Sequence, residues 1–277
     1  MRLIKAFHSA SLFGISFLAA FFVAACAQPP VRHEPDSLFW PAQPEKPRIK
    51  YVQSIYREDD LGREYSFLEK IFGKGYLDSM VRPYGVSVTG GKLYVTDIVS
   101  RSVTVYDLDR KRLIAVISGR DARFRMPAAA VSDKDGNIYV ADSGGSSVIV
   151  YNHLGLFRSM MQIPGGKPVG LALNDKLGRL YVSDRERHRI VVFDLKGTLL
   201  FEFGARGTDK GKFNIPLALT VDGQNRVYVL DSGNFRVQIF DADGAFLSKF
   251  GEVGDQPGAF ANPKGIAVDS EGHIYIT

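Results

Sequence analysis

The sequence predicts an all-β fold, a β-propeller of four-stranded blades, and three observations lead to this prediction. Prolines recur every 41 to 48 residues, a short apolar run follows each proline at a nearly fixed distance, and turns rich in glycine, asparagine and aspartate separate the apolar runs. Repeats of this period bury their apolar faces only against neighbouring copies. Sheets stacked radially around an axis satisfy that need.

Each repeat reaches the same landmarks in the same order. The starting prolines are Pro83, Pro127, Pro168, Pro216 and Pro263. Eleven to thirteen residues later a tyrosine opens a β-prone run, which in four repeats ends in aspartate: Asp97, Asp142, Asp184 and Asp231. Nine residues beyond each aspartate stands an aromatic residue, at Tyr106, Tyr151, Phe193 and Phe240. Tight turns between these runs predict four antiparallel strands in each repeat.

The first 25 residues have the pattern of an export signal. Arg2 and Lys5 precede the apolar stretch from Leu12 to Val23, which is shorter than a typical membrane span. The following Val23-Ala24-Ala25-Cys26 resembles the bacterial lipobox, whose cysteine becomes the first mature residue and carries lipid such as palmitate. We therefore expect a lipoprotein signal peptide over residues 1–25 and a lipidated Cys26. The alternatives are an ordinary signal peptide and an uncleaved anchor helix.

A proline-rich segment separates this signal from the repeats. Residues 26–47 contain six of the chain's thirteen prolines, so we expect the lipidated cysteine and an extended tether, with Trp40 either in water or docked on the folded domain. Residues 48–80 are expected to form a lead-in whose first part, residues 48–56, is an outer strand that closes a propeller ring. The propeller itself is expected over residues 81–277, as four complete repeats and the start of a fifth.

Composition excludes some classes of function. The chain is 45% hydrophobic and 12% aromatic, which favours a globular domain with a substantial core. The formal charge of +5 falls to +3 without the first 25 residues, and the basic residues are scattered among acidic ones. Nucleic acid is therefore not an expected partner.

Particular residues also carry a resemblance to a known family. The run from Asp231 to Asp241, followed by Gly244, Phe250-Gly251, Gly258, Phe260 and the run from Pro263 to Asp269, looks like an NHL repeat. The resemblance covers residues 81–277 and is weakest in the second repeat, where Ser147 replaces the usual arginine. With the lipobox and the tether, the whole chain resembles bacterial lipoproteins described as six-bladed NHL propellers. Six blades need roughly 270 residues, so a C-terminally truncated ring is expected.

The repeated aspartates have two interpretations. Asp97, Asp142, Asp184 and Asp231 are expected on the face where propellers gather ligands around the central channel, so they are candidates for a ring of ligand-binding carboxylates. Alternatively each one is structural, capping a turn or pairing with an arginine five residues later, as Arg189 and Arg236 permit. We favour the structural interpretation, because aspartate after a strand commonly bonds to nearby backbone.

Loop positions that differ between repeats are better candidates for recognition, because the scaffold does not dictate their side chains. These positions are residues 98–101, 143–146, 185–188 and 232–235. The candidate binding residues among them are Arg101, Arg185, Arg187, His188 and Phe235. The group from Arg185 to His188 is the most highly charged, and it is suited to an anionic partner or a metal unless it is simply solvated.

An enzymatic alternative rests on a second resemblance. Peptide-amidating lyases resemble NHL propellers, hold zinc through histidines of different blades, and carry a run similar to Asp184-Arg185-Glu186 with a later Arg189-Ile190. Here His33 falls in the tether, and His153 and His273 fall in turns expected on the opposite face from His188. We therefore expect no metal and no cofactor, and assign no catalytic residue.

The sequence thus predicts a non-enzymatic binding or scaffold module of the bacterial cell envelope. It would be attached to the membrane through lipid, on the outer membrane facing the periplasm because Ala27 and Gln28 follow the cysteine. Its ligand would be a protein or a small molecule on the channel face. The alternative is a metal-dependent lyase or hydrolase that uses the same face.

Overall fold

The computed structural model describes residues 39–40, 49–56, 58–62, 80–117 and 124–277. The chain divides into two compact units, Met1–Gln53 and Ser54–Thr277. In the first unit β1 (Phe39–Trp40) pairs antiparallel with β2 (Ile49–Lys50). Within the described residues 49–56, strand is present only in β2, which pairs with β1. The predicted export signal, Cys26 and most of the predicted tether lie outside the described residues.

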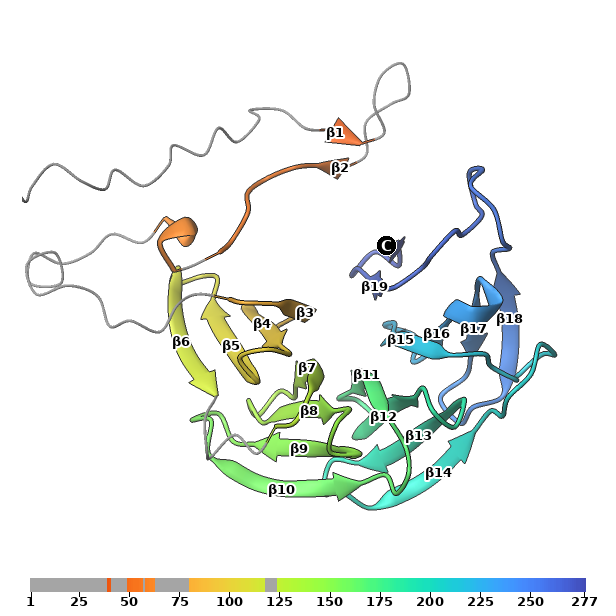
Figure 1. Ribbon diagram of the computed structural model, residues 1–277, viewed down its shortest axis with the longest axis horizontal. Helices are drawn as coiled ribbons and strands as arrows, with labels where there is room; N and C mark the ends of the chain where they lie inside the picture. The colour runs from red at the N-terminus through yellow and green to blue at the C-terminus, as the bar shows by residue number, and fades with distance from the viewer. Residues whose placement is uncertain (1–38, 41–48, 57, 63–79, 118–123) are drawn as a thin grey trace, which may run out of the picture. The chain divides into compact units, whose positions relative to one another are not determined.

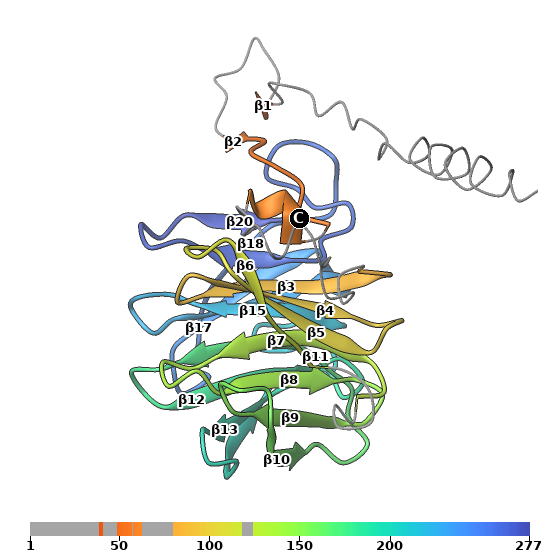
Figure 2. The same cartoon turned by 90° about the vertical axis from the view of Figure 1, so that its left-hand side faces the viewer.

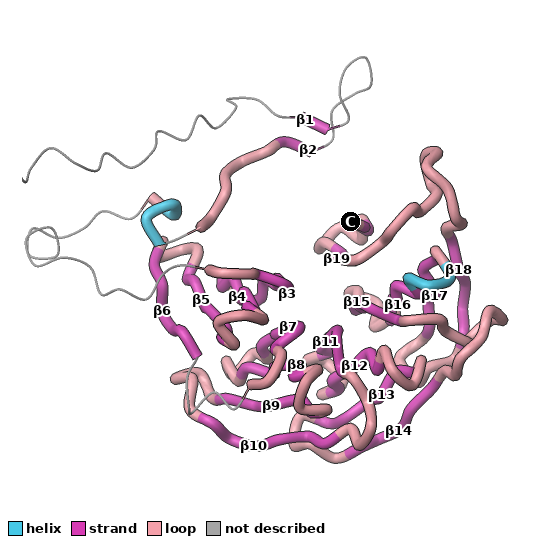
Figure 3. Tube along the Cα trace, in the orientation of Figure 1, coloured by secondary structure: helices cyan, strands magenta, loops and turns pink. Residues whose placement is uncertain are grey.

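In the described part of the second unit, the regular secondary structure is almost entirely strand, arranged in antiparallel sheets that loops and turns connect (Figure 3). Blade 1 contains β3 (Pro83–Thr89), β4 (Lys92–Asp97), β5 (Ser102–Asp107) and β6 (Arg112–Ile117). Blade 2 contains β7 (Pro127–Ser132), β8 (Ile138–Asp142), β9 (Ser147–Tyr151) and β10 (Phe157–Gln162). Blade 3 contains β11 (Pro168–Asn174), β12 (Arg179–Asp184), β13 (Arg189–Asp194) and β14 (Leu199–Phe203).

Blade 4 contains β15 (Pro216–Val221), β16 (Val227–Asp231), β17 (Arg236–Phe240) and β18 (Phe246–Phe250). Blade 5 contains β19 (Ile266–Val268) and β20 (Ile274–Ile276). The short 3-10 helices of the described chain are η1 (Glu58–Leu61) and η3 (Ser232–Asn234). No helix in these described ranges is long and apolar enough to cross a membrane.

Within this unit the blades follow one another around a common axis (Figure 1). The first strand of each blade lies nearest the axis, and β3, β7, β11, β15 and β19 contact one another in that order. Seen from the side, β7 to β10 lie side by side in chain order (Figure 2). The predicted all-β propeller with four-stranded blades is therefore confirmed.

The core lies between neighbouring blades. Leu171 of β11 packs against Tyr139 and Val148 of blade 2, while Leu219 occupies the equivalent position in blade 4 and packs against blade 3. Only 6% of the Leu171 surface is exposed, whereas the equivalent Val86 of blade 1 is 72% exposed. Burial at this position therefore depends on a neighbouring blade on that side.

The antiparallel connections divide the loops between two faces. Turns that join the first strand to the second, or the third to the fourth, lie at one end of each blade, and we call this end the turn face. Connections from the second strand to the third, and from one blade to the next, lie at the other end, which we call the channel face. The described channel-face loops are residues 98–101, 143–146, 163–167, 185–188, 204–215, 232–235 and 251–265.

Candidate functional site

The repeated aspartates hold the channel face together from inside. One Asp97 carboxylate oxygen accepts the backbone N–H groups of Val81 and Arg82, each at 2.6 Å, and the other accepts those of Val99 and Ser100 at 2.9 and 2.8 Å. One side chain thus ties the entry of β3 to the loop that follows β4. Burial alone raises the pKa of Asp97, but donors from Ser100, Arg82 and Val99 outweigh it and lower that pKa.

Related contacts recur in the next two blades. Asp142 accepts the backbone N–H of Met126 at 2.6 Å, and Asp184 accepts those of Lys167 and Arg187 at 2.9 and 3.3 Å. All four repeated aspartates are at most 1% exposed. Their oxygens accept hydrogen bonds from groups inside the protein, which favours the structural interpretation, and that interpretation stays a prediction.

Arginine partners are present in blades 3 and 4. Arg189 Nε donates to Asp184 at 3.1 Å, and its Nη1 bonds to Glu202 on β14. In blade 4, Arg236 Nε donates to Asp231 at 2.8 Å. Each pair therefore lies where the sequence placed it, five residues apart across the loop that joins the second strand to the third.

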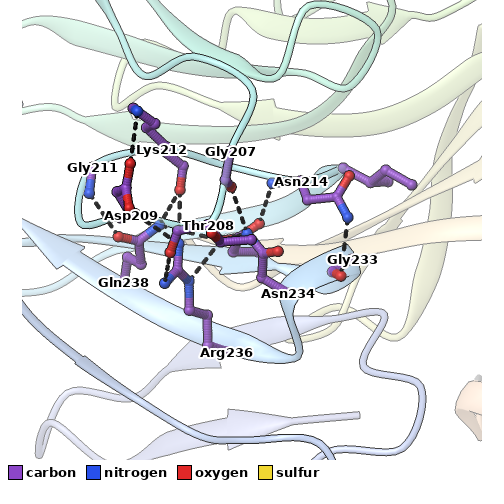
Figure 4. A network of polar contacts seen from close by, with 12 residues as sticks. Gly207, Thr208, Asp209, Gly211, Lys212, Asn214, Gly233, Asn234, Arg236 and Gln238 are labelled. Atoms are coloured by element: carbon purple, nitrogen blue, oxygen red, sulfur yellow. Dashed lines mark hydrogen bonds and ion pairs between the residues drawn. The ribbon is translucent and has the colours of Figure 1, made fainter.

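The Arg236 guanidinium also holds the loop of residues 204–215, which leads from β14 into blade 4 (Figure 4). Its Nη1 donates to the carbonyl oxygen of Thr208 at 2.7 Å, and its Nη2 donates to those of Asp209 and Lys212, each at 2.9 Å. Gln238 Nε2 donates to Lys212 O at 2.7 Å, and Gln238 Oε1 accepts the Gly211 N–H at 2.9 Å. Sequence reasoning did not find Gln238 or this loop.

A signal for both was present in the sequence. Gln238 follows Asp231 by seven residues, and the corresponding residues of the other repeats are Thr104, Ile149 and Val191. The loop begins at Gly204, whose φ of +90° and close approach to the Phe213 ring exclude a side chain. A glutamine in an otherwise apolar strand, after a long loop that begins with glycine, therefore indicates that the glutamine side chain hydrogen-bonds to the loop backbone.

The loops after the second strands share one backbone feature. The last residue of each has a left-handed conformation with φ between 52° and 54°, and these residues are Arg101, Ser146, His188 and Phe235. This conformation is uncommon and strained for residues other than glycine. Four different side chains therefore start from equivalent points on the channel face. Three of them, Arg101, His188 and Phe235, were among the predicted binding residues.

The predicted binding residues differ in their exposure and in the hydrogen bonds that they form within the protein. Arg101, Arg185 and Arg187 are exposed, and Arg187 Nε makes one long contact of 3.4 Å with Gly165 O. His188 is half-buried, and its Nδ1 accepts the Ile215 N–H at 3.0 Å, which links blade 3 to the loop entering blade 4. His188 thus has a packing role that the sequence did not indicate.

The described histidines do not converge on one site. His153 lies in the turn between β9 and β10 and His273 in the turn between β19 and β20, both on the turn face, whereas His188 lies on the channel face. Across the described ranges there is no group of three or more His, Cys, Asp or Glu residues arranged to hold a metal ion.

Comparisons with known proteins agree with this architecture. The NHL repeat family model matches residues 166–193 and 213–240, which lie in blades 3 and 4 and contain both aspartate–arginine pairs. No curated protein matches the sequence.

Three solved structures illustrate the structural similarity. A streptogramin B lyase is 18% identical with a TM-score of 0.55, covering 70% of this chain and 61% of that one. A catalytically inactive variant of virginiamycin B lyase from Staphylococcus aureus, with quinupristin, is 16% identical with a TM-score of 0.56, covering 71% and 63%. A nidogen/laminin complex is 19% identical with a TM-score of 0.57, covering 74% and 75%.

At these identities the similarity shows the fold alone. The chain spans less than two thirds of the length of the two lyases, so their activity is not assigned to it. The described chain is a β-propeller that carries NHL repeats in blades 3 and 4.

Proposed function

We propose that this protein is a lipid-anchored binding or scaffold module of the bacterial cell envelope, whose channel face recognises a protein or a small ligand. The observation that carries the proposal is the set of equivalent left-handed loop ends at Arg101, Ser146, His188 and Phe235. Each of these loops ends with the same left-handed φ but with a different side chain. A rigid scaffold with variable side chains is typical of recognition surfaces.

The hydrogen bonding of the buried polar side chains supports a surface that is ordered before a ligand binds. In the described part of the chain no buried side-chain nitrogen or oxygen lacks a hydrogen-bond partner. The polar groups that hold the loops, such as Asp231, Arg236 and Gln238, are buried, while Arg185 and Arg187 remain exposed. A surface ordered before binding loses little conformational entropy when a ligand arrives.

Site-specific photo-crosslinking tests the recognition surface. A photoreactive amino acid at Arg101, Arg187 or Phe235 in living cells should give discrete covalent adducts. The same residue at Gln224, exposed on the turn face of blade 4, is the matched control and should give none. The Arg185→Glu/Arg187→Glu variant, crosslinked from Phe235, should reduce the yield if the partner is anionic. Equal adducts from both faces would contradict a channel-face site.

Lipid anchoring is tested separately. Because Cys26 follows small residues after an apolar segment, Cys26→Ser should abolish incorporation of labelled fatty acid and leave an unprocessed precursor or a soluble protein. Fractionation of the wild type between inner and outer membranes tests the expected outer-membrane location. Wild-type protein that takes up no label yet stays in the membrane would refute lipidation.

The alternative is a metal-dependent lyase or hydrolase on the same face. Among the described histidines, His188 is the one on the channel face, and its Nδ1 is engaged by backbone, which leaves Nε2 for a metal. If this alternative holds, a chelator should abolish turnover of a lactone or amide substrate panel and zinc should restore it. The binding proposal instead expects crosslinking that is unchanged by the chelator.

A further inference from the structure

A pocket of about 300 Å³ lies on the turn face, between blades 2 and 3. It is lined by Tyr139, Val150, Arg158, Ser159, Leu195 and Lys196. The first four residues belong to β8, β9 and β10, and the last two form the turn between β13 and β14. The pocket is therefore separate from the channel-face loops, and it has the volume of a small-ligand site.

The next junction, between blades 3 and 4, shows how this space can be closed. There Arg179 extends from β12 to the equivalent turn of blade 4, where its Nη1 donates to Ala242 O at 2.7 Å and bonds to Asp243 at 2.8 Å. The Tyr181 hydroxyl also donates to Ala242 O at 2.8 Å. The residues corresponding to Arg179, Ala242 and Asp243 at the junction of blades 2 and 3 are Asn137, Leu195 and Lys196.

Both partners of the closing ion pair are thus replaced. Asn137 is shorter than arginine, and Lys196 puts a cation where blade 4 has the carboxylate of Asp243. The Tyr139 hydroxyl lies 3.4 Å from Leu195 O, a longer contact than its counterpart at the next junction. Among the described residues, no arginine comparable to Arg179 crosses this junction, which is consistent with the open space there.

The charge of the lining is positive. Its two charged side chains, Arg158 and Lys196, are both cations, and within the described residues neither forms an ion pair. Arg158 Nη1 donates to Asn137 Oδ1 at 2.6 Å, which leaves other guanidinium N–H groups available. The nearby Asp133 carboxylate already accepts from Asn137 and from the Tyr139 hydroxyl.

We propose that this pocket binds a small oxyanion, a sulfate, phosphate or carboxylate group, through Arg158, Lys196 and the Ser159 hydroxyl. A guanidinium and an ammonium carry only donors, and a serine hydroxyl can also donate to such a group. Hydrogen bonds between ionised partners are the stronger kind. The oxyanion is either a free inorganic ion or the anionic end of a larger molecule. This site goes beyond the recognition surface on the channel face.

The experiment titrates detergent-solubilised full-length protein by calorimetry with sodium sulfate, phosphate, acetate and glycerol 3-phosphate. Sodium chloride at equal ionic strength corrects for screening. Arg158→Gln and Lys196→Gln should each weaken binding by about tenfold or more, the effect of removing a hydrogen bond to a charged group. Tighter binding of glycerol 3-phosphate than of phosphate would identify the anionic end of a larger molecule as the ligand.

The decisive variant copies the neighbouring junction. Asn137→Arg combined with Lys196→Asp recreates the pair formed by Arg179 and Asp243, fills the pocket and should abolish binding while the protein stays folded by circular dichroism. Lys176→Gln removes one turn-face cation outside the pocket and should leave the dissociation constant within about twofold. Anion binding that survives the double variant, or that chloride reproduces in the wild type, would overturn the proposal.

Discussion

Blades 3 and 4 contain the same aspartate–arginine pair but use the arginine differently. In blade 3 the Arg189 side chain is 17% exposed and bonds to Asp184 and to the exposed Glu202. In blade 4 the Arg236 side chain is 6% exposed and bonds to Asp231 and to three backbone carbonyl oxygens. One pair lies near the surface, and the other forms the centre of a buried network.

The length of the preceding connection explains the difference. Five residues, 163–167, join β10 to blade 3, whereas twelve residues, 204–215, join β14 to blade 4. The longer loop folds over the end of blade 4, where the Phe213 ring packs against Phe203 and Phe240. Its inward carbonyl groups need donors, because an unpaired buried carbonyl is costly. Arg236 supplies them, and the short loop of blade 3 makes no such demand on Arg189.

The comparison shows that an identical motif has a different energetic weight in each blade. The Arg189 guanidinium is partly solvated, and without it the buried Asp184 carboxylate would still accept the backbone N–H groups of Lys167 and Arg187. The Arg236 pair is desolvated, and losing the arginine would leave the buried Asp231 carboxylate without its charged partner.

The largest expected effect is that of Arg236→Ala, which should lower the free energy of unfolding by about 3–5 kcal/mol, the usual result of breaking a buried ion pair. Arg189→Ala should lower it by about 1–2 kcal/mol, because the buried Asp184 loses one donor but keeps its backbone donors. Urea unfolding of the two variants measures the difference. Arg236→Ala should also speed hydrogen exchange of the Gly207 and Phe213 amides, whose bonds close the loop.

Arg236→Lys is the matched control for charge. Lysine keeps the cation but lacks the planar donors that reach several carbonyls at once, so it should recover only a small part of the lost stability. If Arg189→Ala proved as destabilising as Arg236→Ala, loop length would not be the cause of the difference between the blades.

A smaller effect is expected from exchanging the residues at the centre of the third strand. Gln238→Val gives blade 4 the residue of blade 3 and removes the bonds to Lys212 O and the Gly211 N–H, so it should cost about 1–2 kcal/mol. Val191→Gln buries an amide in blade 3, which lacks the long loop, and should cost about 1–3 kcal/mol. Thermal unfolding of both variants measures these costs. A Val191→Gln variant as stable as the wild type would refute the comparison.

The sequence predicted the scaffold more completely than the site. The repeated proline, tyrosine and aspartate fixed the strands, because each residue type has a strong local preference and the period repeats four times. The pairing of Asp231 with Arg236 was also predictable, since only five residues separate them. The carbonyl partners of Arg236 depend on how a twelve-residue loop folds back, and the His188 contact with Ile215 depends on the packing of two blades. Neither follows from local preference.

The smallest expected effect concerns the turns between the first and second strands, where blade 4 has Asp222 and blade 3 has Asn174. Burial alone raises the pKa of Asp222, but donors from Arg226, Tyr228 and Gln224 outweigh it and lower that pKa. Asn174 bonds to Leu177 and Asn225 and does not titrate. The pH dependence of stability should therefore differ between the two turns.

Because the pKa of Asp222 is lower in the folded state, its stabilisation is present above the unfolded pKa of about 4 and is lost as pH falls through the folded pKa. Asp222→Asn should lower the free energy of unfolding by about 1 kcal/mol at pH 7. This difference from the wild type should shrink at the lowest pH where both remain folded. Asn174→Ala should show a difference that does not change with pH. A constant difference for Asp222→Asn would show that its hydrogen bonds stabilise the turn without any contribution from its charge.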